Sequence, residues 1–510
     1  MVKSSIIKGA IILTIAGVIT RILGFVYRIY MSNAIGAEGM GLYQLIIPIY
    51  TLAWSISCSG FTTTISKLTA QELAKGQYGN IRRILKQSTI ISTLIGILLT
   101  FALYFSAEFI AIHIFKDERT ILSLKIMSLA FPFMAAGSCI RGYFFGLKES
   151  TIPAINQVLE QCVRMVVVFF LASFFIPLGL EYACAAATIG IVAEEIFSFL
   201  YAIVVYKKFK IRNHFKILPS LSSKQSLTLI TVMALPLTAN RVTGSLLATW
   251  ENILIPQSLQ RFGLTASEAI SLYGQITGMA MPLIFFPTAF LISLAISLVP
   301  AISEASAMKN YKKIKYTTEK SLLFSTVMGF GAASLFVSFN NELGSVIYNQ
   351  DISSMLFLLG IICPFMYVQM VLSGILNGLG YQVFIFRNSL ISSFINIGFI
   401  YFLVPLHGLN AFILGWFISL IVVCFLEIEK LVETVSIKFE FFDFLLKPLL
   451  CAILSALVIR LISSYLFSDA VSEILSLILG CIVLSCIYLA LIILTGCLKL
   501  EDLKLIMKRK

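Results

Sequence analysis

The sequence predicts an all-α polytopic membrane protein with fourteen transmembrane helices, arranged as two parallel-repeat six-helix lobes plus two extra helices. Three observations carry this prediction: an apolar composition, a series of long hydrophobic runs, and an internal repeat. Of the 510 residues, 59% are hydrophobic and only 12% are charged, and the mean hydropathy is +0.96. Soluble globular domains carry about twice that charged fraction, so the composition alone indicates a membrane protein.

The apolar runs are each long enough for a helix to cross ~30 Å of hydrocarbon. They cover about residues 7–36, 41–66, 84–107, 120–146, 152–177, 181–206, 226–256, 268–300, 317–340, 353–380, 382–405, 409–431, 444–467 and 471–498. The first run continues well past signal-peptide length, and no small-residue cleavage site follows it. We therefore expect it to be retained as the first span.

Lysine and arginine are distributed very unevenly between the predicted loops. With the N-terminus inside, 28 of the 38 basic residues fall in cytoplasmic segments and four fall in external ones. The positive-inside rule then places both termini in the cytoplasm and the chain in the cell membrane. The same bias accounts for the net charge of +13, so we expect no nucleic-acid partner.

An internal repeat relates the first six spans to the next six. Residues 131–134 (FPFM) recur at 363–366 (CPFM), and 176–179 (IPLG) recur at 404–408 (VPLHG). Because six is even, the two halves share one orientation and are related by an axis along the membrane normal. We predict an N-lobe at 1–206, a basic cytoplasmic linker at 207–225, a C-lobe at 226–434, and two unrepeated spans with a basic cytoplasmic tail at 435–510.

The first span carries two arginines in a strongly apolar setting. Gly17, Arg21, Gly24 and Arg28 share one helical face. An arginine at mid-membrane depth costs at least ~2.5–3.5 kcal/mol, so we interpret this face as the lining of a cavity that meets an anionic substrate. The alternative is that both arginines reach opposite interfaces or are held in structural pairs. Arg141, in the fourth span, is expected near the cytoplasmic end, where its side chain reaches the interface.

Other polar side chains inside spans mark further candidate sites. The candidates are Arg164, Gln157, Asn240 and Arg241 for substrate binding, and Glu160, Glu194, Glu195 and Glu251 for ion coupling. Glu160 and Arg164 are also spaced for an i,i+4 structural pair on one helix. The competing interpretation of Glu194 and Glu195 is pairing with an arginine, and that of Glu251 is solvation near the outer end of its span.

Several classes of function are disfavoured by what the sequence lacks. The ten cysteines form no C-x-x-C pair and the three histidines are isolated, so we predict no disulfide framework, no metal site and no catalytic residue. The sequence contains no Gly-rich phosphate-binding loop, so we expect no cofactor. The external loops are too short for the active site of a membrane polymerase or ligase. A major-facilitator transporter has two spans fewer, and its Gly-x-x-x-Asp-Arg-x-Gly pattern is missing after the second span.

Several of these residues carry a family resemblance. Residues 21–28 (RILGFVYR) and 35–43 (IGAEGMGLY) resemble the opening of the stage V sporulation protein B family. This family belongs to the polysaccharide-exporter branch of the multidrug/oligosaccharidyl-lipid/polysaccharide flippase superfamily. Three further runs agree, at 60–67 (GFTTTISK), 153–157 (PAINQ) and 298–304 (LVPAISE). Phe61 stands where the family usually has proline.

The resemblance implies a flippase that moves undecaprenyl-pyrophosphate-linked saccharides, similar to lipid II, to the outer leaflet by alternating access. It implies work in cell-wall or spore-cortex synthesis, with membrane lipids and the cell-wall synthesis machinery as partners. The drive would be the membrane potential or a gradient of Na⁺ or H⁺. Arg21 matches an arginine that lines the central cavity of lipid II flippases, and the last two spans imply a groove for the lipid tail. The alternative is a cation-coupled multidrug or organic-ion exporter of the same superfamily, against which the cationic residues argue.

Overall fold

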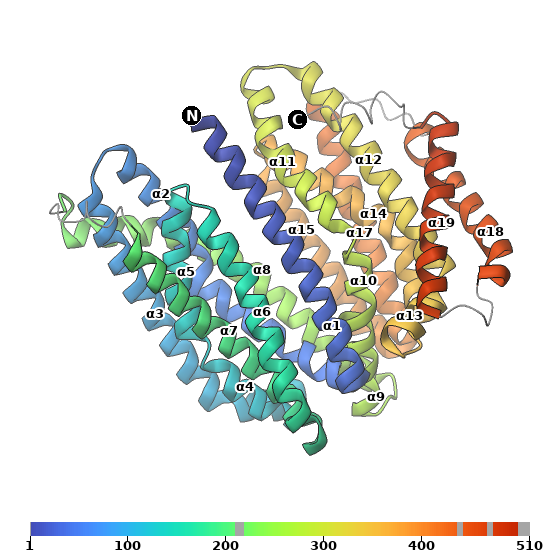
Figure 1. Cartoon of the computed structure of the whole chain (residues 1–510), viewed down its shortest axis with the longest axis horizontal. Coiled ribbons are helices and arrows are strands. Elements are labelled where there is room, and N and C mark those ends of the chain that lie inside the picture. The colour runs from blue at the N-terminus through green and yellow to red at the C-terminus, as the bar shows by residue number, and fades with distance from the viewer. Residues whose placement is uncertain (1, 210–218, 436–441, 467–472, 498–510) are drawn as a thin grey trace. The chain divides into compact units, whose positions relative to one another are not determined.

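The computed structural model describes residues 2–209, 219–435, 442–466 and 473–497, and it is almost entirely helical (Figure 1). In these four ranges, eleven helices are long and apolar enough to cross a membrane, or up to twelve if the bent pair Glu118–Ser128 and Phe131–Gly146 forms one span. The chain is therefore a multi-pass α-helical membrane protein. The count of fourteen spans stays a prediction.

Internal packing divides the chain into two compact units, 1–274 and 275–510. The first contains α1 (Val2–Trp54), α2 (Gly60–Ala74), α3 (Tyr78–Phe109), α4 (Ile121–Ser128), α5 (Phe131–Gly146), α6 (Thr151–Phe175), α7 (Leu180–Lys208), α8 (Ser223–Arg261) and α9 (Ala266–Gly274). The second contains α10 (Met281–Phe285), α11 (Thr288–Ala307), α12 (Tyr311–Ser338), α13 (Asn340–Tyr348), α14 (Ser353–Gly378), α15 (Gln382–Gly398), α16 (Val404–His407), α17 (Leu409–Val435), α18 (Lys447–Leu466) and α19 (Glu473–Leu494). The lobe boundaries given above stay a prediction.

Every predicted span overlaps a helix, although several spans are not single straight helices. The first two spans meet in α1, which changes direction at Gly36, where φ is 69° and ψ is −174°. Glycine adopts this backbone conformation without steric cost. The predicted eighth span is divided into α9, a π-helical segment at Gln275–Ala280, α10 and α11. The polar side chains of α8, which corresponds to the seventh span, keep it outside the set of strongly apolar helices.

Local side-chain bonds set the ends of several helices. At the start of α8, Ser222 Oγ accepts from the Gln225 N–H at 3.2 Å, and Gln225 Oε1 accepts from the Ser222 N–H at 2.9 Å. This reciprocal capping box satisfies two backbone donors. Asn310 Oδ1 accepts from the Lys313 N–H at 3.0 Å and begins α12. Asn349 follows α13 with φ 51°, a left-handed conformation that ends a helix.

Glycines that repeat in the sequence make equivalent contacts in the two units. A Cβ on Gly142 of α5 would lie 2.6 Å from the carbonyl oxygen of Thr62 in α2. A Cβ on Gly374 of α14 would lie 3.0 Å from the Cα of Ala295 in α11. Small residues let membrane helices approach this closely, which increases van der Waals packing between them. The repeat therefore preserves a helix-packing contact within each unit.

Replacing Gly142 with alanine is expected to lower the free energy of unfolding by about 1–3 kcal/mol, because the added methyl group overlaps a backbone atom of α2. Gly244→Ala is the matched control, since a Cβ there meets nothing within 4 Å. Alanine is also the better helix former, so the control should be neutral or slightly stabilising. Thermal unfolding of the purified variants in detergent measures both effects. Equal transition temperatures would contradict the packing described for α5 and α2.

The last two membrane helices pack on α12 within the second unit. Figure 1 shows α18 and α19 side by side, and both contact α12. The Tyr488 hydroxyl of α19 donates to the Val327 carbonyl oxygen at 2.8 Å, and the Tyr488 ring lies against Gly331. A shared apolar core that includes Phe330 and Ile492 surrounds this contact. The predicted lipid-tail groove of these two spans stays a prediction.

Candidate functional site

Charged side chains from α5, α6 and α7 meet inside the first unit. Arg141 of α5 lies 3.3 Å from Glu160 of α6, and Arg164 of α6 lies 3.3 Å from Glu194 of α7. Glu160 and Arg164 thus each pair with another helix, and the i,i+4 pair that their spacing allows is not formed in the described part of the chain. These four residues, together with Glu195, are called the first-unit polar network below.

Neutral side chains complete the hydrogen bonding of two carboxylates in this network. Asn156 Nδ2 donates to Glu160 Oε1 at 2.9 Å and to Ser198 Oγ at 2.7 Å. The Ser198 hydroxyl in turn donates to Glu160, and the Tyr50 hydroxyl donates to Glu195. Both glutamates lie among apolar helices, where a carboxylate without such donors costs several kcal/mol. Helices α1, α6 and α7 therefore stabilise these acids jointly.

Arg164 also contacts the first helix. Its guanidinium donates to Gln161 Oε1 and lies 5.3 Å from the centroid of the Tyr27 ring, within cation–π range. A Cβ on Gly24 would lie 3.9 Å from Gln161 Nε2, so Gly24 borders the network. The face of α1 on which two cations were predicted therefore adjoins the paired charges of α6 and α7.

The network holds three carboxylates and two guanidiniums. Glu194 pairs with Arg164, which is the structural interpretation considered for it in the sequence. The Nε atoms of Arg141 and Arg164 are buried and have no hydrogen-bond acceptor within the described ranges. The network therefore holds one carboxylate more than it has guanidiniums.

Three predicted substrate-binding side chains lie outside the network and are exposed. Arg21 lies on α1, and Asn240 and Arg241 lie on α8 of the same unit. None of the three makes a hydrogen bond or ion pair with any side chain that the structure describes. The other predicted residues of this unit are partly buried: Arg28, Gln157 and Glu251. Arg21 and Arg241 are thus cations that remain available to an anion.

Sequence reasoning missed the role of one member of the network and three of its hydrogen-bond partners. Arg141 was expected to reach the interface, but it pairs with Glu160 instead. Gln161 directly follows the predicted site residue Glu160. Its polar amide inside an apolar span could have marked it as a candidate site residue as well. Tyr50 and Ser198 give no such signal, because both residue types are common in membrane helices and their burial depends on packing.

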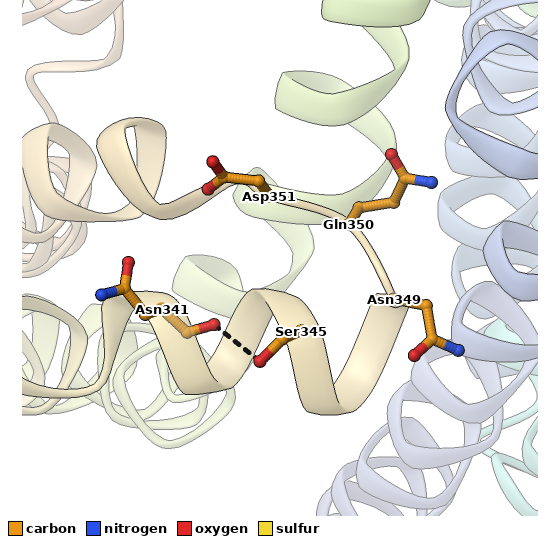
Figure 2. Close-up of a pocket in the computed structure, with 5 residues that line it drawn as sticks. All are labelled: Asn341, Ser345, Asn349, Gln350 and Asp351. Carbon is orange, nitrogen blue, oxygen red and sulfur yellow. Dashed lines mark hydrogen bonds between the residues drawn. The ribbon is translucent and has the colours of Figure 1, made fainter.

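An open polar pocket of about 420 Å³ lies in the second unit (Figure 2). Its walls come from α13 and the turn that follows it, and they are Asn341, Ser345, Asn349, Gln350 and Asp351. Hydrogen bonds from the Ser353 hydroxyl and N–H hold the pKa of Asp351 below its ordinary value, so the pocket keeps a negative charge. None of the predicted site residues lines this pocket.

Two family models match the chain. The model described as "Polysaccharide biosynthesis protein" matches residues 6–306, and the model "MatE" matches residues 276–402. The first match covers more than half of the chain and includes the whole first-unit polar network as well as Arg21 and Arg241.

Curated and solved proteins agree with these matches. The chain is 32% identical over 475 residues to stage V sporulation protein B of Bacillus subtilis (strain 168), covering 91% of each chain. It is 26% identical over 368 residues to the lipid II flippase MurJ of the same organism, covering 65% of this chain and 64% of the relative. A solved lipid II flippase MurJ in an inward closed conformation matches with a TM-score of 0.68 and 17% identity, covering 94% of this chain and 98% of that chain.

Proposed function

Because this chain belongs to the polysaccharide biosynthesis protein family, together with stage V sporulation protein B, we propose that it is a flippase for a lipid-linked saccharide. The cargo is a saccharide on undecaprenyl pyrophosphate, either a lipid II-like peptidoglycan precursor or another polysaccharide unit. It crosses the cell membrane from the inner to the outer leaflet by alternating access. Both termini lie in the cytoplasm, and the product serves cell-wall or spore-cortex synthesis. The chain carries out transport and no chemical reaction.

The observation that carries the proposal is the pair of exposed arginines on the first unit. Arg141 and Arg164 already have carboxylate partners, whereas Arg21 and Arg241 have none in the ranges described. A pyrophosphate cannot cross ~30 Å of hydrocarbon with its charge uncompensated. A guanidinium offers a planar fork that suits two phosphate oxygens at once, and it stays charged throughout. Arg28, Asn240, Gln157 and Gly24 complete the proposed substrate surface.

The drive for transport belongs to the same proposal. Glu160, Glu194 and Glu195 of the first-unit polar network, with Glu251 of α8, are the proposed coupling acids. The excess of carboxylate over guanidinium supports uptake of one H⁺ or Na⁺ at the network. Because the network borders α1, a change in its charge can alter how α1 packs on α6. Membrane potential is the other candidate drive, since it acts on any charge that moves.

Complementation tests the proposed cargo. Bacterial cells depleted of their own lipid II flippase would express this chain, with membrane insertion confirmed by immunoblot of the membrane fraction. Restored growth is the expected result. A well-inserted chain that restores no growth would show that lipid II is not the cargo and would leave other undecaprenyl-pyrophosphate saccharides to be tested in the same way.

The MatE match to residues 276–402 supports the alternative, a cation-coupled exporter of drugs or organic ions. Binding distinguishes the two functions, because a site for organic cations needs acidic residues where this chain exposes Arg21 and Arg241. Purified protein should bind undecaprenyl pyrophosphate and ignore lipophilic cations such as tetraphenylphosphonium. The opposite preference would establish the exporter.

A further inference from the structure

A buried carboxyl group in the second unit belongs to none of the sites above. Glu427 of α17 is 0% exposed. Its Oε1 accepts from the Ser373 hydroxyl of α14 at 2.8 Å, and Ser373 Oγ accepts from Gln369 Nε2 at 3.1 Å. Its Oε2 is buried and has no hydrogen-bond partner in the described ranges.

Asn388 of α15 is the second unexplained group, because it is 0% exposed and neither its Oδ1 nor its Nδ2 has a hydrogen-bond partner among the described residues. Two contacts made by the residues that flank α15 set its antiparallel register with α17: Phe399 lies against Gly415, and the Tyr381 hydroxyl lies 3.4 Å from Thr434 Oγ1. In this register Asn388 lies level with Glu427. We call Glu427, Ser373, Gln369 and Asn388 the Glu427 cluster.

The internal repeat explains why this acid lacks a cation. Ser373 lies 232 residues after Arg141, and Asn388 lies 232 residues after Asn156, which is the spacing of the repeated prolines at 132 and 364. In the first unit, Arg141 stands 3.3 Å from a carboxylate, and Asn156 donates to that carboxylate at 2.9 Å. The same spacing relates Glu427 to Glu195, and it places Ser392 at the position of Glu160. The second unit therefore keeps the asparagine and one acid, but it has Ser373 in place of Arg141.

Charged and titratable groups on the elements packed around Glu427 do not replace that arginine. On α15, the guanidinium of Arg387 lies 4.8 Å from the centroid of the Phe384 ring. On α17, Lys430 pairs with Glu433 at 2.9 Å and Cys424 donates to the Phe365 carbonyl oxygen. On α14, Tyr367 donates to the Ile284 carbonyl oxygen, and on α12, Lys320 lies over Tyr316 and Lys315 pairs with Glu319. No ion pair to Glu427 is formed by any described residue.

From this geometry we propose that the Glu427 cluster is a proton-binding site in the second unit. An ionised carboxylate in a dry helical interior with no counter-charge is too costly to persist, and a proton removes the charge. The protonated carboxyl gains an O–H donor, and Asn388, at the same level on α15, has an amide oxygen without a hydrogen-bond partner among the described residues. The absence of exposed surface at Glu427 favours a bare proton over a hydrated metal cation. The proton is released when the cluster opens to water or the pH rises.

Infrared difference spectroscopy of the purified full-length chain tests this proposal. Spectra are recorded during a pH titration for the wild type, Glu427→Gln and Glu433→Gln. Glu433 is the matched control, because it lies on the same helix but is 58% exposed and paired with Lys430. The expected result is a carbonyl band of a protonated carboxylic acid at neutral pH that disappears in alkaline buffer, is missing from Glu427→Gln and is retained in Glu433→Gln. The difference between the wild type and Glu427→Gln separates this band from that of any proton held by the first-unit polar network.

Ser373→Ala provides a second variant that keeps the carboxyl group. It removes the hydroxyl that donates to Glu427 Oε1, so the same band should remain but shift in frequency. The proposal is wrong if the wild type shows no such band at neutral pH, or if added Na⁺ at constant pH removes it. Neither measurement needs a lipid, so failure here leaves the flippase proposal untouched. A role for this proton in driving transport would rest on that proposed function.

Discussion

Arg21→Ala is expected to weaken binding of undecaprenyl pyrophosphate to the purified protein by about 10- to 100-fold. A hydrogen bond to a charged group contributes about 1.5–3 kcal/mol, and each 1.4 kcal/mol is tenfold in affinity. Arg21 is exposed on α1 and has no ion-pair partner within the described ranges, so its removal leaves no carboxylate orphaned and should not destabilise the fold. Isothermal titration calorimetry in detergent measures the change.

Two further variants make this prediction specific. Arg21→Lys keeps the charge but loses the planar fork, so its affinity should fall between those of the wild type and the alanine variant. Arg82→Ala removes another exposed arginine, near the start of α3 (Tyr78–Phe109), and should bind as the wild type does. Equal losses in Arg21→Ala and Arg82→Ala would mean that binding depends only on the overall positive charge. Unchanged binding by Arg21→Ala would remove Arg21 from the site.

The membrane class and the helices could be predicted from the sequence because both depend on local composition. A run of about 20 apolar residues must form a helix in lipid, whatever its neighbours are. The repeated FPFM and CPFM motifs also predicted matching parts of two halves, and Gly142 and Gly374, which follow these motifs at the same distance, both lie at close helix contacts. Local composition does not show how two spans join. At Gly36, for example, α1 changes direction without ending.

The partners of the buried charges could not be predicted, because they depend on which helices pack together. The i,i+4 spacing alone predicted an ion pair between Glu160 and Arg164 on one helix. In the structure, Arg164 pairs with Glu194 on the neighbouring helix, since α6 and α7 pack along their length. Glu427 was missed for a related reason: its lack of a cation becomes evident only when Ser373 is compared with Arg141 across the repeat.

Arg164→Met is expected to lower the free energy of unfolding by about 3–5 kcal/mol, because it leaves the Glu194 carboxylate buried without its cation. Lys430→Met is the matched control for a broken ion pair. Its partner Glu433 is largely exposed and can be solvated by water, so the cost there should be about 0–1 kcal/mol. Thermal unfolding in detergent, monitored by intrinsic fluorescence, ranks the variants by stability.

Adding Glu194→Gln to Arg164→Met should recover much of this loss, because the penalty comes from the orphaned charge and a paired ion in a protein interior is close to neutral in net stability. A double variant no more stable than Arg164→Met would mean that Arg164 stabilises the unit through Tyr27 and Gln161 instead.

The recovered double variant also distinguishes a structural role of Glu194 from a role in ion coupling. If Glu194 takes part in ion coupling, this variant should fold and insert but fail to restore growth in the complementation assay. If the pair only holds α6 and α7 together, growth should return along with stability.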